Sequence, residues 1–197
     1  LLLASASPRR RELLERVGIA IEVQAADVDE SVLPGEEAVT YATRVAEAKA
    51  AKVAALQVGR WVLAADTVVE VSGEPMGKAS NREEADRMLR ALRGSVHRVT
   101  TAVALQRAGE DASRESLHVT TEVTMREFSD AELEDYLVAS EWQGKAGAYA
   151  VQGMAAAFVT GVRGSISNVI GLPLSEIVVL LADRGVVEPS YKTGISA

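Results

Sequence analysis

Segments of strand type, rich in Val, Ile and Thr, alternate with helical segments along the 197 residues of this chain. Such an order predicts a mixed α/β fold, in which a sheet is covered by helices. No low-complexity stretch, fixed-period repeat or Pro- or Ser-rich linker marks a boundary. We therefore expect residues 1–197 to form a single domain, or two small lobes that share a cleft.

Composition narrows the classes of protein to consider. The chain has no cysteine, which excludes disulfides and thiolate sites and fits a reducing compartment, and its net charge of −7 opposes binding to a nucleic acid polymer. Its longest apolar runs, such as Ile177–Ala182, fall far short of the roughly 20 residues of a membrane span. Leu1–Ala4 is too short for a signal-peptide core, and because Leu1 stands where an initiator Met is expected, we expect a few residues to precede it. We expect a cytoplasmic protein without a membrane segment.

Local patterns predict the individual elements. We expect strands over Leu1–Ala4, Ile19–Gln24 and Trp61–Val71, the last interrupted at Ala65-Asp66-Thr67, and a hairpin of Val96–Gln106 with Leu117–Glu127. We expect helices after Ser7, over an alanine-rich segment around Tyr41–Lys49, from the cap Asn81 to Gly94, from the cap Ser129 to about Val138, and over Leu174–Ala182.

The turn Ser5–Arg10 is a candidate phosphate site. Ser7 is placed to cap a helix, and Pro8 suits its first position. Arginines in a first helical turn oppose the helix dipole unless an anion compensates them, and a guanidinium donates two hydrogen bonds to phosphate. The alternative interpretation is a capped helix with solvated basic residues.

Two groups of carboxylates are candidates for metal binding. Asp27, Asp29 and Glu30 form an acidic loop whose oxygens suit Mg²⁺ or Mn²⁺, although the residues fit a solvated loop equally well. Asp66 interrupts an apolar strand, where burial without a partner is costly. At a strand end or bulge it can bind a metal or take a proton from water, whereas the alternative is a turn between two strands that Asp66 caps.

Other residues carry weaker signals. Lys49 and Lys78 are possible phosphate contacts, and Gln152 lies in a glycine-punctuated stretch where it can contact a base edge; the alternative for that stretch is two tight turns. His97 and His118 lack metal-ligand spacing, and we assign them no role. The chain has no G-x-x-x-x-G-K-[ST] loop and no G-x-G-x-x-G after a strand, so kinase, GTPase and dehydrogenase functions lose support.

Taken in order, these segments resemble the Maf family of nucleotide pyrophosphatases from residue 2 to about residue 185. The motifs are A-S-A-S-P-R-R-R-E-L-L, D-V-D-E, K-A-A-K, A-A-D-T-V-V, G-K, H-R-V-T-T-A-V, K-A-G-A-Y-A-V-Q-G and N-V-I-G-L-P-L. The resemblance implies an elongated, curved mixed sheet with a cleft between two lobes, usually in a homodimer. It also implies hydrolysis between the α- and β-phosphates of a nucleoside triphosphate, assisted by Mg²⁺, Mn²⁺ or a similar cation.

Site residues carry over from the family's motifs. They are Ser5, Arg9 and Arg10 at the phosphate turn, Glu30, Lys49, Asp66 as general base, Lys78, Thr67 and Gln152. The metal would be held by Glu30 with Asp66 or Asp29. Thr67, Gln152 and Arg9 relate to base choice, and a sister subgroup acting on 7-methyl-GTP has Gln where this chain has Thr67.

The resemblance therefore favours dTTP and UTP as substrates, in the house-cleaning of nucleotide pools. Two departures from the family pattern stand out: Ala79 replaces a usual Pro, which makes the position of Lys78 less certain, and Ile166 replaces a frequent aromatic residue. Two other hypotheses remain open. One is a nucleotide-binding regulator of cell division or septum formation, and the other is a pyrophosphatase for modified nucleotides.

Overall fold

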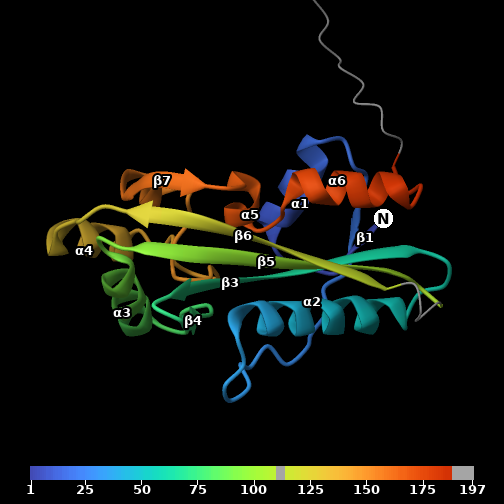
Figure 1. The fold of residues 1–197 in the computed structure, drawn as a ribbon, viewed down its shortest axis with the longest axis horizontal. Helices are drawn as coiled ribbons and strands as arrows, with labels where there is room; N and C mark the ends of the chain where they lie inside the picture. The colour runs from blue at the N-terminus through green and yellow to red at the C-terminus, as the bar shows by residue number, and fades with distance from the viewer. Residues whose placement is uncertain (110–113, 188–197) are drawn as a thin grey trace, which may run out of the picture.

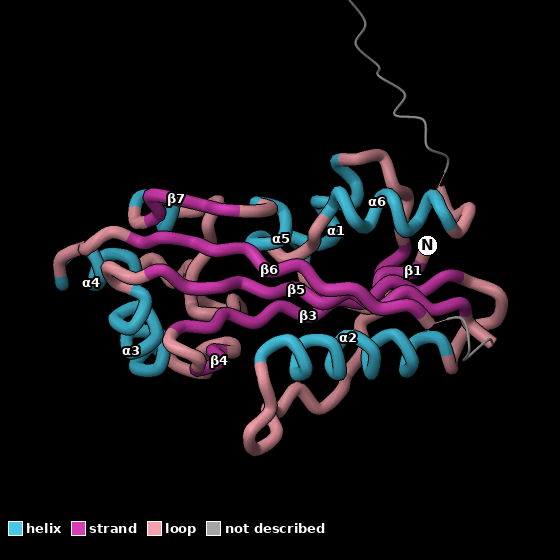
Figure 2. The backbone as a smooth tube through the Cα atoms, in the orientation of Figure 1, coloured by secondary structure: helices cyan, strands magenta, loops and turns pink. Residues whose placement is uncertain are grey.

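A seven-stranded mixed sheet with helices on both faces forms the framework of the protein (Figures 1 and 2). The computed structural model describes residues 1–109 and 114–187. The strands are β1 (Leu2–Leu3), β2 (Glu22–Val23), β3 (Trp61–Val71), β4 (Glu74–Met76), β5 (Val96–Arg107), β6 (Glu115–Met125) and β7 (Val159–Arg163). The helices are α1 (Pro8–Arg16), α2 (Ala38–Ala54), α3 (Arg82–Leu92), α4 (Asp130–Val138), the 3₁₀ turn η2 (Met154–Ala157), α5 (Ile166–Ile170) and α6 (Leu174–Asp183). The predicted mixed α/β fold is confirmed.

Three long antiparallel strands, β3, β5 and β6, run along the molecule and give it an elongated shape (Figure 2). The order across the sheet is β2-β1-β3-β5-β6-β7, and β4 pairs with β3. The short strands β1 and β2 add in parallel at the edge formed by β3. The predicted hairpin is confirmed as β5 and β6, while the tip of its loop, residues 110–113, lies outside the described residues.

One edge of β3 has strand partners only at its two ends. At the start, β1 pairs through Val62 and Leu63, and at the far end β4 pairs through the last residues of β3. Among the described residues, no strand pairs with residues 64–68 on this edge, although β5 pairs with all of them on the other side. We call residues 64–68 the open β3 edge. Asp66 lies at its centre.

The predicted interruption of β3 at Ala65-Asp66-Thr67 is wrong, because β3 is continuous and Asp66 pairs in register with Ala102 of β5. The interpretation of Asp66 as the cap of a turn between two strands fails for the same reason. A carboxylate is tolerated inside this strand because Lys49 lies beside it, on α2. The residues adjacent to Asp66 in sequence do not indicate this partner, because Lys49 is 17 positions away.

Alternation along β3 sends neighbouring side chains to opposite faces of the sheet. Val62, Ala64 and Val68 belong to the core formed with α2, whereas Leu63 and Ala65 belong to the core formed with α1 and α6. Figure 1 shows α2 along one face and α1 and α6 along the other. Asp66 consequently faces α2, and Thr67 faces α1. A third core, at the end of the sheet that carries α3 and α4, includes Val69 and Val99.

Two predicted helix starts are confirmed by their caps. Asn81 accepts a hydrogen bond from the Glu84 amide at 2.8 Å, and Ser129 with Glu132 forms a complete capping box. The second strand is shorter than predicted, Glu22–Val23 in place of Ile19–Gln24. Within the described residues, the helices are all too short or too polar to cross a lipid bilayer.

Candidate functional site

A cavity of about 540 Å³ lies at the open β3 edge. Its walls come from the β1–α1 turn, α2, β3, α5 and the segment 143–152, which is far from the others in sequence. With the exception of Asp29, the site residues expected from the family resemblance line it: Ser5, Arg9, Arg10, Glu30, Lys49, Asp66, Thr67, Lys78 and Gln152. The volume suits a small ligand such as a nucleotide.

On the α2 side of the cavity, two carboxylates and two lysines form one chain of ion pairs. Lys49 Nζ contacts Asp66 Oδ1 at 2.8 Å and Glu30 Oε1 at 2.7 Å, while Lys78 Nζ contacts Glu30 Oε2 at 2.8 Å. Asp66 and Lys49 are only 4% and 5% exposed. Each therefore supplies a partner that compensates for the burial of the other.

Glu30 is the member of the acidic loop that reaches the cavity. Burial alone would raise the pKa of Glu30, but hydrogen bonds from Lys49 and Lys78 outweigh it and lower the pKa to about 2. Its backbone carbonyl accepts a hydrogen bond from the Tyr41 hydroxyl at 2.9 Å, which ties the loop to α2. Asp29 lies outside the lining, and its carboxylate accepts the Ser31 amide at 2.8 Å.

The backbone at Lys78 is held by the segment 143–152. Lys78 forms an antiparallel bridge with Ala146, and the Gly147 amide donates to the Gly77 carbonyl at 3.0 Å. Ala79, where we expected the missing Pro to leave Lys78 less well placed, is buried in the core beside α3. The bridge and the Gly147–Gly77 hydrogen bond hold the backbone on both sides of this position.

Arg10 is buried, and its guanidinium donates to acceptors of the protein itself. It donates from Nε to the Gly171 carbonyl (2.9 Å), from Nη1 to the Ala65 carbonyl (2.8 Å) and Ser5 Oγ (3.1 Å), and from Nη2 to Thr67 Oγ1 (3.0 Å). The Ala65 carbonyl belongs to the open β3 edge, so Arg10 takes the place of a neighbouring strand there. Four of the five Arg10 donors are thus satisfied without a bound anion, and Arg10 ties three segments of the cavity wall together.

From Thr67 the hydrogen bonds continue across the sheet. The Thr67 and Thr101 hydroxyls are 2.9 Å apart, and Thr101 donates to the Asn168 carbonyl at 3.0 Å. Because Thr101 donates its proton to Asn168, Thr67 is the donor between the two threonines. The Asn168 side chain in turn donates to the Val99 carbonyl at 2.9 Å. This directed chain fixes the floor of the cavity against α5.

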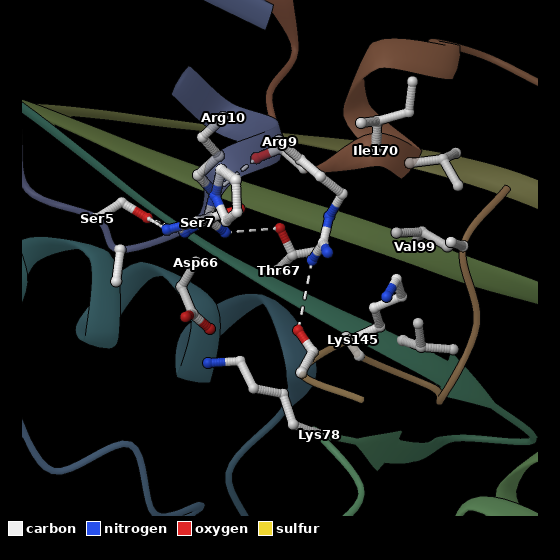
Figure 3. A pocket seen from close by; sticks show the side chains of 18 of the residues that line it. Ser5, Ser7, Arg9, Arg10, Asp66, Thr67, Lys78, Val99, Lys145 and Ile170 are labelled. Atoms are coloured by element: carbon white, nitrogen blue, oxygen red, sulfur yellow. Dashed lines mark hydrogen bonds between the residues drawn. The ribbon is translucent and has the colours of Figure 1, made fainter. Parts of the chain in front are cut away.

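The other residues of the first α1 turn behave differently from Arg10. Arg9 is partly buried, faces the cavity and makes one long hydrogen bond of 3.4 Å to the Gly144 carbonyl (Figure 3). Arg11 is exposed and forms an ion pair with Glu15 at 2.8 Å. Ser7 caps α1 by position, as predicted, but its side chain makes no capping hydrogen bond.

Three residues at or behind the cavity wall went unassigned from sequence. Lys145 and Tyr149 line the cavity, and His97 lies behind Tyr149, with Nε2 2.8 Å from the Tyr149 hydroxyl. Burial lowers the pKa of His97 to about 4, so its ring is neutral at pH 7. His118, which we also left without a role, is exposed. No spacing signal in the sequence links His97 to Tyr149.

Comparison with known proteins identifies relatives along nearly the whole chain. Residues 1–184 match the family described as Maf-like protein. A protein of Anaeromyxobacter dehalogenans strain 2CP-1 named dTTP/UTP pyrophosphatase is 50% identical over 186 residues, covering 94% of each chain. One of the same name from Myxococcus xanthus is 49% identical over 189 residues, covering 96% of this chain and 94% of its own.

Among solved structures, the Ham1 protein of Staphylococcus aureus aligns with 63% of this chain and 70% of its own, at 18% identity and a TM-score of 0.42. The family match spans all the cavity-lining segments, from the β1–α1 turn to α5, and the resemblance of the eight motifs is thereby confirmed. This chain belongs to the Maf family.

Proposed function

We infer that this protein hydrolyses dTTP and UTP between the α- and β-phosphates, releasing the nucleoside monophosphate and pyrophosphate and so clearing these nucleotides from cellular pools. The observation that carries the inference is the convergence of distant segments on one cavity, whose lining includes a buried carboxylate paired with a lysine, Asp66 with Lys49, and the N-terminus of α1. The relatives named dTTP/UTP pyrophosphatase support the choice of substrates.

Asp66 is the base in this proposal. It is nearly buried, and its Oδ1 contacts Lys49 Nζ at 2.8 Å. It accepts a proton from a water molecule, whose oxygen attacks the α-phosphorus while the bond from that phosphorus to the oxygen of the leaving pyrophosphate breaks. The geometry of Asp66 is fixed by the pairing of β3 with β5 on one side and by Lys49 on the other.

Charge on the phosphates is neutralised by groups already gathered at the cavity. Ser5 and the free amides at the start of α1 suit phosphate oxygens, because the N-terminus of a helix attracts anions. Lys78, half-exposed at the rim, and Arg9 add positive charge where the departing pyrophosphate accumulates negative charge. Arg10 holds Ser5 in place through its hydrogen bond of 3.1 Å.

Glu30 and Asp66 fit a divalent metal by their chemistry. Both supply hard carboxylate oxygens, and both contact the single ammonium of Lys49, so they are close enough to share one cation. Within the described residues no third His, Asp or Glu joins them, which leaves the remaining ligand positions to water and phosphate oxygens. When bound there, Mg²⁺ or Mn²⁺ neutralises phosphate charge and acidifies a water molecule.

The test is pyrophosphate release from a panel of nucleoside triphosphates with Mg²⁺ or Mn²⁺, comparing the wild type with Asp66→Asn. We expect selective turnover of dTTP and UTP, and a loss in kcat of about 10²- to 10⁴-fold in the variant, the usual contribution of a general base. Glu70→Gln is the matched control, because Glu70 also lies on β3 but pairs with Arg98 outside the cavity.

Full activity of Asp66→Asn would refute the assigned base. If nucleotides bind but none is cleaved, the proposed activity fails and a nucleotide-binding regulator of cell division becomes the better hypothesis. If modified nucleotides are hydrolysed faster than dTTP and UTP, modified nucleotides become the assigned substrates.

We also propose that the protein is cytoplasmic, that it forms a homodimer and that residues 1–197 make one domain. The absence of cysteine and the family membership support these proposals, and the net charge of −7 argues against a nucleic acid polymer as partner. Light scattering tests the dimer by mass. A single cooperative unfolding transition is the result expected for one domain.

A further inference from the structure

The cavity has two chemically different ends. Glu30, Lys49, Asp66 and Lys78 form the charged end. The opposite end is apolar and is lined by Val69, Val99, Val169, Ile170 and Tyr149. Val69 and Val99 are register partners on β3 and β5, next to the Thr67–Thr101 pair on the same face of the sheet. A base is the apolar, planar part of a nucleotide, so it fits this second end.

The two ends lie on opposite sides of β3. Asp66 and Val69 are three residues apart on one continuous strand, about 10 Å along β3, and their side chains point to opposite faces of the sheet. A nucleotide with its reacting phosphate beside Asp66 and its base beside Val69 therefore passes around the open β3 edge, with which no strand among the described residues pairs. Gly147 limits the depth of the apolar end of the cavity, because its backbone lies against the Val69 side chain.

Lys145 lies near the apolar end, and the Arg9 guanidinium lies between Lys145 and Asp66 (Figure 3). Unlike Lys49 and Lys78, neither forms an ion pair with a carboxylate in residues 1–109 and 114–187. Lys145 Nζ donates one hydrogen bond, of 3.3 Å, to the Gln143 carbonyl, which leaves two of its three donors for a ligand. Burial lowers the pKa of Lys145, and the charge of Arg9 lowers it further.

We propose that Lys145 is a specificity-determining residue that donates a hydrogen bond to the 4-carbonyl of the pyrimidine bound at the apolar end. An ammonium has donors and no acceptor. Uracil and thymine present an oxygen at ring position 4, whereas cytosine presents an amino group there, whose hydrogens face the ammonium without an acceptor between them. Lys145 consequently favours UTP and dTTP over CTP, and the surrounding Val side chains accommodate the thymine methyl group.

This proposal rests on the proposed function, because it specifies the base for which that cavity is selective. It concerns binding as well as turnover, so it is testable even on nucleoside monophosphates. A donor that opposes an amino group leaves two groups unpaired away from water, and such mismatches discriminate strongly between otherwise similar ligands.

The experiment compares the wild type with Lys145→Met in two assays. In the first, kcat/KM is measured for UTP, dTTP and CTP. In the second, calorimetry measures the binding of UMP, CMP and inorganic pyrophosphate. Met keeps the length and the apolar stem of Lys and removes a charge that Arg9 repels, so we expect no loss of thermal stability. Arg87→Met is the control for the loss of a positive charge, because Arg87 is exposed on α3 and lies outside the cavity lining.

We expect kcat/KM for UTP and dTTP to fall about 10- to 100-fold in Lys145→Met, the usual effect of losing a charged hydrogen bond. CTP turnover should stay within about twofold, UMP binding should weaken, and pyrophosphate binding should not change. Equal losses for UTP and CTP, or weaker pyrophosphate binding, would assign Lys145 to the phosphates and overturn the proposal, as would unchanged UTP selectivity. If the wild type cleaves no nucleotide, the proposed function fails, and the comparison of UMP with CMP binding alone decides the role of Lys145.

Discussion

Replacing Arg10 with Met removes four hydrogen bonds from the wall of the cavity. Ser5 and Thr67 have hydroxyls that rotate toward other partners, but the carbonyls of Ala65 and Gly171 are left without a donor inside the protein. A buried, unpaired polar group costs about 1–3 kcal/mol. Two carbonyls together give a destabilisation of about 4 kcal/mol. Because Met also avoids the cost of burying a charged guanidinium, part of this destabilisation is offset.

For a chain of this size, 1 kcal/mol corresponds to about 2–4 °C in Tm, so we expect Arg10→Met to unfold about 10 °C below the wild type. Scanning calorimetry measures this directly, and urea unfolding gives the free energy at one temperature. Arg11→Met is the control: its ion pair with Glu15 is exposed and of the i, i+4 type, so its loss should change Tm by no more than about 2 °C.

The Arg10→Lys variant tests whether Arg10 acts through its hydrogen-bond geometry or only through its positive charge. A lysine keeps the positive charge but lacks the planar fork that reaches four acceptors. If Arg10 acts by joining segments, Arg10→Lys should lose most of the stability that Arg10→Met loses, and kcat should fall with it. A stable Arg10→Met protein, or full activity in Arg10→Lys, would refute this reasoning and favour a direct contact between Arg10 and phosphate.

Two further predictions concern stability. Burial lowers the pKa of His97 to about 4, so the unfolded chain, with an ordinary pKa near 6.5, binds the extra proton between pH 6.5 and 4. Stability should therefore fall as pH falls through this window, by about 2 kcal/mol between pH 7 and pH 5. Urea unfolding at both pH values checks this, and a His97→Phe variant that keeps the full pH dependence would contradict it. Gly147→Ala should destabilise the protein by about 1–3 kcal/mol, because φ is +65° and a Cβ would lie 2.9 Å from Val69 Cγ2. Gly144→Ala is its control, since φ is +66° there and no atom lies within 4 Å of the added Cβ; equal unfolding free energies for the two variants would exclude the clash.

Helix caps and cavity-lining residues were predictable because their signals are local or depend on motif order. Asn81 and Ser129 precede their helices at the spacing that a cap requires, and the structure has both. The site residues were identified through a resemblance that spans the chain, and each of them except Asp29 lines the cavity. Arg10 shows the limit of this approach. Its motif marks it as a phosphate contact, but one of its partners, Gly171, is 161 residues away in sequence, and Ala65 is 55 residues away.

The continuity of β3 was not predictable for a related reason. A carboxylate in an apolar run indicates a break when its neighbours in sequence are the only partners considered. The partner of Asp66 is Lys49, 17 residues earlier on a different element. Likewise, only the folded chain brings His97 within hydrogen-bonding distance of Tyr149. Long-range pairs of this kind depend on the register of the sheet and the placement of α2, which short-range patterns do not encode.

The open β3 edge also bears on how the protein avoids aggregation. Unpaired strand edges attract strands from other chains, and proteins commonly protect them with charges or by making them short. Here β1 and β4 limit the edge to residues 64–68, and the Arg10 guanidinium already bonds the Ala65 carbonyl. A foreign strand would also have to cover the charges of Asp66 and Lys49. The opening that admits a small ligand is therefore closed to another polypeptide strand.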